Sequence, residues 1–343
     1  ACDMPTIDHR SPLFGQILHP AREGVRKVLK SDRAEIFIFP STGTGGWETA
    51  LSNCLSAGNK VLAARNGMFS HRWIDMCQRH GLDVEIVETM WGEGLPADRY
   101  EEILTADKNH EIKVVLATHN ETATGVRSDI AAVRRALDAA GHPAMLFVDG
   151  VSSIASIDFR MDEWGVDLAV TGSQKGLMLP AGLGVLAVSE KAMAASKTAT
   201  MRRAYFEFSD MVALNATGYF PYTPPTQLFH GLRRSLDRIF AEGLDNVIAR
   251  HRRLAEGVRR GVQAWGLNLV AEAPVITQPV TAILPFSSNV IRAGTSLPLP
   301  AGNVMMPSPP SPSDVSYEPS GIRPMSAMFR LTWLEDVPAS TSV

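Results

Sequence analysis

The sequence predicts an α/β fold in which a mostly parallel β-sheet lies between helices, followed by a smaller C-terminal α/β domain. Two observations predict this fold. Short apolar runs alternate with helical stretches from Glu35 to Val188, which is the pattern of repeated strand–helix–strand units. The chain has 343 residues, of which 45% are hydrophobic, enough for one large domain and a second, smaller one.

The strands are expected where Val, Ile, Leu, Phe and Ala form short runs, because a sheet buried on both faces needs apolar residues at every position. These runs are residues 36–39, 60–63, 84–87, 113–117, 145–148, 168–170 and 184–188. Helices are expected between them, over residues 45–55, 70–80 and 130–140, and Gly141 ends the last of these. One or two long helices are expected over residues 227–265, which are rich in Leu, Arg, Glu and Ala.

This pattern divides the chain into three parts. Residues 1–225 are the predicted large domain, with an N-terminal arm over residues 1–30 that we expect to be incomplete. Residues 226–265 are linking helices, and residues 266–343 are the C-terminal small domain, which becomes abnormal from about residue 285. From there to about residue 324 the sequence is rich in Pro and Ser. Proline removes amide donors and fixes φ, so this segment predicts little regular structure and a disrupted small domain.

The composition excludes several classes of function. The net charge is −3 with both signs intermixed, so neither nucleic acid nor a membrane is an expected partner. The sequence has no apolar run long enough to span a bilayer and no signal-peptide pattern at its start. Cys2, Cys54 and Cys77 form no CxxC pair, so we expect no disulfide framework and no metal site. Reduced thiols favour the cytoplasm.

The first candidate site follows the expected strand over residues 36–39 and reads Ser41-Thr42-Gly43-Thr44-Gly45-Gly46-Trp47-Glu48. Small and hydroxyl residues at the start of a helix let backbone amides approach an anion, and the helix N-terminus adds a positive field. A phosphate group is the expected ligand. The spacing is neither a P-loop nor a dinucleotide fingerprint, and a plain helix cap is the alternative.

The second candidate is Asp149, which ends the apolar run Phe147-Val148. Ligands of parallel sheets bind at the carboxyl ends of the strands. A carboxylate buried there is costly unless it has a partner. A cationic heterocycle nitrogen is a suitable partner, and a helix cap or a buried ion pair is the alternative.

The third candidate is Lys175, in the small-residue loop Gly172-Ser173-Gln174-Lys175-Gly176. A crowded and partly desolvated loop can lower the pKa of a lysine enough to make it a nucleophile. A solvated loop lysine is the alternative.

A phosphate cradle, an aspartate at a strand end and a lysine in a small-residue loop occur in this order in the class V aminotransferases, a branch of the fold-type I pyridoxal-phosphate (PLP) enzymes. The resemblance runs from about Asp3 to Leu284. The motifs that are most similar to serine–glyoxylate and alanine–glyoxylate aminotransferases are Met4-Pro5-Thr6-Ile7-Asp8-His9-Arg10, residues 41–48, His119-Asn120-Glu121-Thr122-Ala123-Thr124-Gly125-Val126 and residues 172–175. Residues 64–73 most resemble bacterial L-aspartate–glyoxylate aminotransferases.

The resemblance implies a fold-type I architecture and a set of contacts with PLP. The implied contacts are Thr42, Gly43, Thr44 and Gln174 at the phosphate, Phe69 and Val151 on the two faces of the ring, Thr122 at the ring hydroxyl, Asp149 at the ring nitrogen, and Lys175 in the covalent link. Lys175 and Asp149 are the implied catalytic residues. For Phe69, plain core packing is the alternative.

The resemblance also implies a homodimer with shared active sites. Tyr222 and Thr223, in Pro221-Tyr222-Thr223-Pro224, match the segment that reaches the phosphate of a neighbouring subunit. A proline-rich turn without a ligand is the alternative. Arg330 falls where the family carries the arginine that binds the substrate carboxylate. The glycine-rich and histidine-containing surroundings of that arginine are absent, so a plain surface arginine is the alternative there.

The implied activity is transfer of an amino group from aspartate or serine to glyoxylate, which gives glycine and a 2-oxo acid. One alternative is another class V reaction, such as β-elimination or desulfuration, but no Cys of this chain lies in a suitable Gly/Ser loop. The other alternative is a partial homologue that binds PLP and is catalytically impaired. The abnormal sequence after residue 285 and the missing N-terminal start favour this second alternative.

Overall fold

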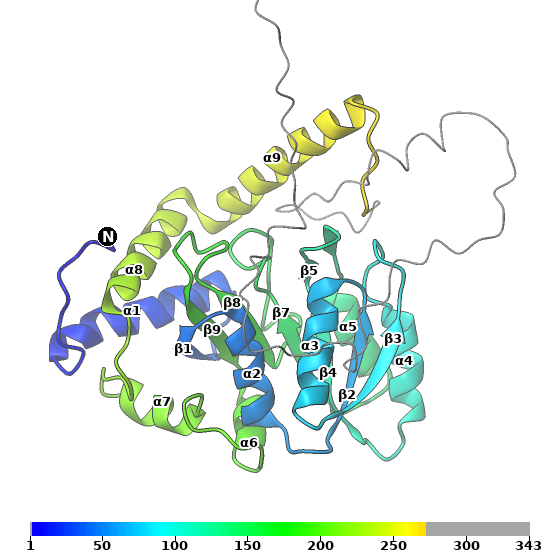
Figure 1. Cartoon of the computed structure of the whole chain (residues 1–343), viewed down its shortest axis with the longest axis horizontal. Coiled ribbons are helices and arrows are strands. Elements are labelled where there is room, and N and C mark those ends of the chain that lie inside the picture. Colours follow the sequence, from blue (N-terminus) through cyan, green and yellow to red (C-terminus); the bar gives the residue numbers. More distant parts are fainter. Residues whose placement is uncertain (1, 272–343) are drawn as a thin grey trace, which may run out of the picture. The chain divides into compact units, whose positions relative to one another are not determined.

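The computed structural model describes residues 2–271, and a seven-stranded mixed sheet forms its centre (Figure 1). The sheet order is β1-β9-β8-β7-β4-β2-β3. Six strands run in one direction, and β9 is antiparallel to both of its neighbours. The strands are β1 (Glu35–Ser41), β2 (Lys60–Arg65), β3 (Asp83–Glu88), β4 (Ile112–Thr118), β7 (Met145–Asp149), β8 (Leu168–Gly172) and β9 (Gly182–Val188). The prediction of a mostly parallel sheet is confirmed.

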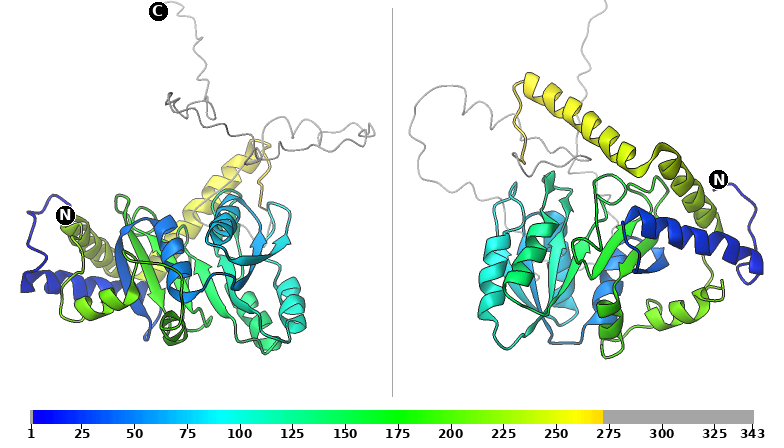
Figure 2. Two further views of the ribbon diagram at one scale, coloured as in Figure 1. Left: turned by 60° about the horizontal axis from the view of Figure 1, so that its bottom comes forward. Right: turned by 180° about the vertical axis from the view of Figure 1, so that it is seen from behind.

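Helices cover both faces of the sheet (Figures 1 and 2). The helices are α1 (Pro12–Val28), α2 (Gly43–Cys54), α3 (Met68–Arg79), α4 (Ala97–Ala106), α5 (Ile130–Ala139), α6 (Glu190–Ser196), α7 (Phe208–Asn215), α8 (Thr226–Glu242) and α9 (Leu244–Ala264). The expected helices are present as α2, α3 and α5, and the long stretch before residue 265 forms α8 and α9. The sequence did not predict α1, α4, α6 or α7. Helix α1 contains Pro20 in its interior, which is a signal against a helix.

The core lies on both faces of the sheet and fixes the strand that carries Asp149. Every residue of β7 and β8 is buried. Burying an apolar side chain such as Leu146 or Phe147 contributes about 1.5–3 kcal/mol to folding. Strand β7 is therefore held firmly, and the carboxyl group at its end is drawn into the interior.

Two smaller features complete the described part of the chain. A short hairpin of β5 (Asn120–Glu121) and β6 (Val126–Arg127) follows β4. Helix α8 packs on α1, where Gly24 leaves room for Leu236: a Cβ on the glycine would lie 2.7 Å from the leucine Cδ1. None of the helices in this part of the chain is long and apolar enough to cross a bilayer. The abnormal segment after residue 285 and Arg330 lie outside the described residues.

Candidate active site

The carboxyl ends of the parallel strands meet at one edge of the sheet, and the three candidate motifs follow these ends. Thr118 at the end of β4 pairs with Asp149 at the end of β7. Gly172 ends β8, the next strand, and leads into the loop of Lys175. Thr42 follows β1, which runs in the same direction two strands further on. The fold therefore brings the predicted phosphate cradle, the aspartate and the lysine to the same edge.

The start of α2 forms a close-packed turn at this edge. Thr42 is the N-cap, and its Oγ1 accepts a hydrogen bond from the Gly45 N–H at 3.5 Å. The first N–H groups of a helix have no partner within the helix and carry its positive dipole. A Cβ on Gly43 would lie 2.6 Å from Val151 Cγ2, and one on Gly172 would lie 3.4 Å from the Gly43 nitrogen. These glycines let three loops approach closely around free backbone donors, an arrangement suited to a phosphate.

Asp149 is the buried acid of the site. Asp149 is only 4% exposed. This burial raises the pKa of its carboxyl group to about 7. The Val151 N–H, which donates to Asp149 Oδ1 at 2.9 Å, opposes the rise, whereas the negative charge of Glu121 adds to it. The Trp47 indole, as a side-chain hydrogen-bond donor, and then the charge of Lys175 also lower this pKa. A cation bound beside Asp149 would restore the charge of its carboxylate.

His119, whose backbone is hydrogen-bonded to that of Asp149, cannot supply that cation. The His119 N–H donates to the backbone carbonyl of Asp149 at 3.0 Å. Burial lowers the pKa of the His119 side chain to about 3, so the ring is neutral at physiological pH. Its Nδ1 lies 2.9 Å from the Ser153 hydroxyl, which in turn donates to the Gly150 carbonyl at 3.3 Å. His119 therefore holds the turn after β7 in place and brings no charge to the carboxylate.

Lys175 lies in a loop whose backbone is fixed while its own side chain is exposed. Ser173 is fully buried and donates to the Pro180 carbonyl at 2.7 Å, which closes the loop. The Ser235 hydroxyl of α8 donates to the Leu177 carbonyl at 2.5 Å and anchors the loop two residues after Lys175. The Lys175 amine is thus accessible, while the backbone that carries it is held in place. The clamping roles of Ser173 and Ser235 were not predicted from the sequence.

Phe69 lies in the first turn of α3 and is half-buried. Its ring contacts Trp47 edge to face, with centroids 6.5 Å apart, and the Arg72 guanidinium lies 5.5 Å from its centroid. The Phe69 N–H donates to Glu121 Oε2 at 3.1 Å. Glu121 is fully buried, and no role for it was predicted. The signal that could have found it is a carboxylate three residues after the end of the apolar strand at Thr118.

The turns that carry Thr122 and Val151 are joined to one another. The Asn120 side-chain amide donates to the Ser152 hydroxyl at 2.7 Å, and that hydroxyl donates to the Asn120 carbonyl at 2.9 Å. Thr122 and Val151 are both half-buried beside this link. Gln174 and Thr44 are exposed at the same edge of the sheet. The predicted cofactor contacts before residue 176 therefore lie on strand ends, helix starts and loops at this edge.

The predicted dimer segment lies close to the phosphate turn of its own chain. The Tyr222 hydroxyl donates to the Ala204 carbonyl at 2.9 Å, and its ring stacks on Tyr205 with centroids 4.5 Å apart. The Tyr205 hydroxyl donates to the carbonyl of Pro40, just before the phosphate turn, at 3.2 Å. Thr223 is exposed.

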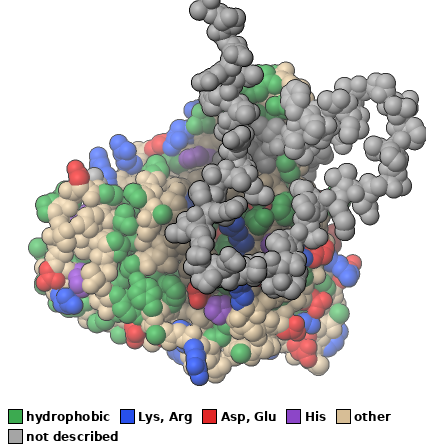
Figure 3. All heavy atoms as spheres, viewed as in Figure 1, with side chains coloured by type: hydrophobic (Ala, Val, Ile, Leu, Met, Phe, Trp, Pro, Cys, Tyr) green, Lys and Arg blue, Asp and Glu red, His purple; other side chains and the backbone are tan. Residues whose placement is uncertain are grey.

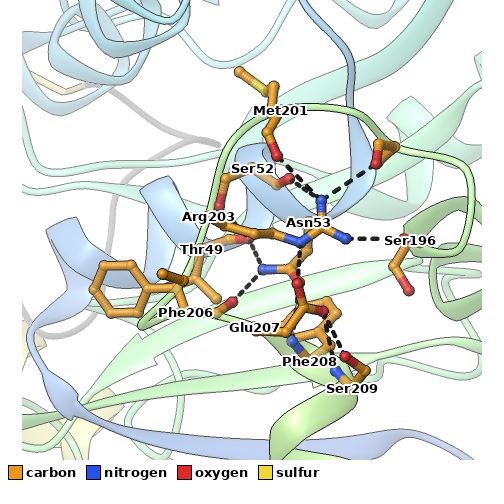
Figure 4. Close-up of polar contacts among 12 residues, drawn as sticks. Thr49, Ser52, Asn53, Ser196, Met201, Arg203, Phe206, Glu207, Phe208 and Ser209 are labelled. Atoms are coloured by element: carbon orange, nitrogen blue, oxygen red, sulfur yellow. Dashed lines mark hydrogen bonds and ion pairs between the residues drawn. The ribbon is translucent and has the colours of Figure 1, made fainter.

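A polar network holds the segment around Tyr205 against α2 (Figure 4). The Asn53 side-chain amide donates to the Phe206 carbonyl at 2.6 Å, and its oxygen accepts from the Phe208 N–H at 3.0 Å. Arg203 donates to the Ser52 carbonyl at 3.0 Å and forms an ion pair with Glu207 at 2.8 Å. The helix that presents the phosphate turn and the support of Tyr222 therefore form one rigid piece. Within the described part of the chain, no cluster of His, Cys, Asp and Glu could hold a metal ion.

The sequence is similar to those of several known aminotransferases. A sequence model of the family "Aminotransferase class-V" matches residues 5–291. The L-aspartate–glyoxylate aminotransferase of Paracoccus denitrificans is 69% identical over 295 residues, which are 85% of this chain and 74% of that protein. The serine–glyoxylate aminotransferase of Hyphomicrobium methylovorum is 58% identical over 287 residues, which are 83% of this chain and 71% of that protein.

A solved structure shows the same fold. The alanine–glyoxylate aminotransferase of Nostoc sp. superposes with a TM-score of 0.77 at 27% identity, over 83% of this chain and 75% of the Nostoc protein. The residues matched by the family model, 5–291, contain the whole edge described above.

Proposed function

Since the chain belongs to the class V aminotransferases, we propose that it uses PLP to move an amino group from L-aspartate or L-serine to glyoxylate. The products are glycine and the matching 2-oxo acid. One observation carries the proposal: the fold gathers a helix start suited to a phosphate, a buried acid and an exposed lysine on a fixed loop at one edge of the sheet. Aspartate is the first donor to test, because the relative at 69% identity is named for it.

The residues present fit PLP. Thr42, Gly43 and Thr44 offer the unpaired amides and hydroxyls at the start of α2 to the phosphate, and Gln174 lies on the loop beside them. Burial raises the pKa of Asp149, and a protonated pyridine nitrogen beside its carboxyl group would favour the charged carboxylate.

Lys175 and Asp149 have distinct tasks in the reaction. When bound, PLP supplies a reactive aldehyde carbon and a ring that accepts an electron pair. Lys175 provides the amine that holds the cofactor, and once free it acts as the base at the Cα of the amino acid. Asp149 keeps the ring nitrogen protonated. Phe69 and Val151 orient the ring from its two faces, and Thr122 binds its hydroxyl.

An isotope experiment tests the proposed reaction. The full chain loaded with PLP is incubated with ¹⁵N-aspartate and glyoxylate, and glycine is analysed by mass spectrometry, with ¹⁵N-serine in a parallel reaction. Label in glycine, absent in Lys175→Ala, is the expected result. A chain that binds PLP and labels no glycine from either donor would contradict the proposed activity and would favour the impaired homologue.

A homodimer with shared sites is part of the proposal. Figure 3 shows hydrophobic side chains gathered in the lower left of the described surface, and α7, on that side of the molecule in Figure 1, exposes Val212 and Leu214. Exposed apolar side chains on α7 and an exposed Thr223 support a contact with a second copy of this chain. The cytoplasm is the proposed location, because all three cysteines are free thiols.

A further inference from the structure

The carboxylate of Glu121 joins two segments that are far apart in the sequence. Its Oε2 accepts hydrogen bonds from the N–H groups of Phe69 and Ser70, at 3.1 and 3.0 Å. Its Oε1 accepts from the Ala123 N–H at 3.0 Å. The first two donors begin α3, and the third belongs to the turn after β5. The N-cap of α3 is Gly67, which has no side-chain oxygen to offer, so Glu121 caps this helix from another part of the chain.

The surroundings of Glu121 are built to hold a buried negative charge. The residue is fully buried, and a buried carboxylate is costly unless hydrogen bonds satisfy it. Three backbone donors and the positive end of a helix do so here. A Cβ on Gly67 would lie 2.2 Å from Glu121 Cγ. The φ of Gly67 is 169°, which is extended backbone, so glycine is needed at this position for space and not for conformation.

The two segments that Glu121 joins carry two of the proposed ring contacts. Phe69 is the proposed stacking residue, and its own N–H is bound by the carboxylate. Thr122 is the proposed partner of the ring hydroxyl, and it lies between Glu121 and the bound N–H of Ala123. One carboxylate therefore sets where the Phe69 ring and the Thr122 hydroxyl lie relative to one another.

We propose that Glu121 is a positioning residue for the cofactor: its carboxylate fixes the start of α3 and the turn after β5, and through them the Phe69 ring and the Thr122 hydroxyl. This role rests on the proposed function, because it needs PLP to occupy the site. Glu121 itself does not touch the cofactor. Its loss should therefore weaken PLP binding and change the environment of the bound ring, beyond any loss of stability.

The test compares Glu121→Gln with Asp107→Asn. Gln keeps the size of the side chain but replaces one acceptor oxygen with a donor. Asp107 is the matched control, because it also accepts two backbone hydrogen bonds, from Glu111 and Ile112 at 3.0 and 2.8 Å, and lies at the opposite edge of the sheet. The dissociation constant of PLP, the visible circular dichroism of the bound cofactor and the unfolding temperature are measured for each full-length variant.

We expect Glu121→Gln to weaken PLP binding about tenfold or more, since small misplacements of binding groups have effects of this size. Its circular dichroism band should change. Asp107→Asn should lower the unfolding temperature and leave both cofactor readouts as in the wild type. An unchanged PLP dissociation constant and an unchanged band in Glu121→Gln would overturn the proposal.

A double-mutant cycle with Phe69→Leu identifies the route of the effect. If Glu121 acts through Phe69, the two losses of PLP affinity are strongly non-additive, whereas additive losses would contradict the proposed route. If Glu121→Gln does not fold, Glu121→Asp replaces it, since it keeps the charge and shortens the reach. If Phe69→Leu alone binds PLP normally, the proposed ring contact is wrong. Normal PLP binding by Glu121→Gln together with weakened binding by Phe69→Leu rejects only the role of Glu121.

Discussion

Replacing Asp149 by Asn should stabilise the cofactor-free protein above neutral pH. The carboxyl pKa is about 7 in the folded chain, against an ordinary value of 3.8. At pH values between 3.8 and about 7, the Asp149 carboxyl group is protonated in the folded chain and ionised in the unfolded chain. The free energy of unfolding therefore falls as the pH rises, by about 1.36 kcal/mol per pH unit, and the loss is complete above pH 7. The total loss in the free energy of unfolding between these two pH values is about 4 kcal/mol.

Asn has the same shape and no charge to desolvate, and it can still accept the hydrogen bond from Val151. In the cofactor-free full-length chain, urea unfolding should show equal stability of wild type and Asp149→Asn near pH 4. The variant should be more stable by up to about 4 kcal/mol at pH 8. With substrates and PLP, the same variant should lose about a thousandfold in rate, because the ring nitrogen loses its counter-ion.

Asp167 provides the control for this experiment. It is also buried, but it accepts from the Leu146 N–H at 2.9 Å and the Ser189 hydroxyl at 3.0 Å, and it lies 3.6 Å from the Lys191 ammonium. Asp167→Asn removes an ion pair and should destabilise the protein at pH 8. The reasoning about Asp149 is refuted if Asp149→Asn is no more stable than the wild type at pH 8, or if the difference does not change between pH 4 and 8.

Two further predictions follow from the geometry of the site. Mixing inactive Lys175→Ala with Thr223→Ala protein should restore part of the activity if subunits share sites, and a stable, active monomer in sedimentation would rule sharing out. Gly43→Ala places a Cβ 2.6 Å from Val151 Cγ2 and should weaken PLP binding at least tenfold, since loops of the phosphate cradle must separate. Gly257→Ala, where a Cβ meets nothing within 4 Å, should bind PLP normally; equal affinities in both variants would contradict the crowding.

The sequence predicted which residues the fold brings to the edge of the candidate site, because strand ends can be located from apolar runs alone. Asp149 and the loop of Lys175 follow such runs directly, and a parallel sheet brings their ends together. The role that we propose for Glu121 could not be predicted in this way. Its partners, Phe69 and Ser70, lie about fifty residues earlier in the chain, and only the packing of α3 against the β5 turn brings them within reach.

Other features were hidden by local signals that point elsewhere. Pro20 argued against a helix, yet α1 runs through it, since packing against α8 and the sheet outweighs the local cost. The Ser235 hydroxyl closes the lysine loop, and it lies in a helix that the sequence marks only as long and rich in Leu, Arg, Glu and Ala. The substrate carboxylate contact proposed for Arg330 and the expected abnormality after residue 285 lie outside the described residues and stay predictions.

Reduction of the PLP-loaded full-length chain with borohydride tests the central claim most directly, because it makes the bond between cofactor and lysine permanent. Peptide mapping by mass spectrometry then locates the modified residue. The account predicts one modified peptide, containing Lys175, and none in the Lys175→Ala protein. Modification of another lysine in place of Lys175, or spread evenly over the exposed lysines, would contradict it.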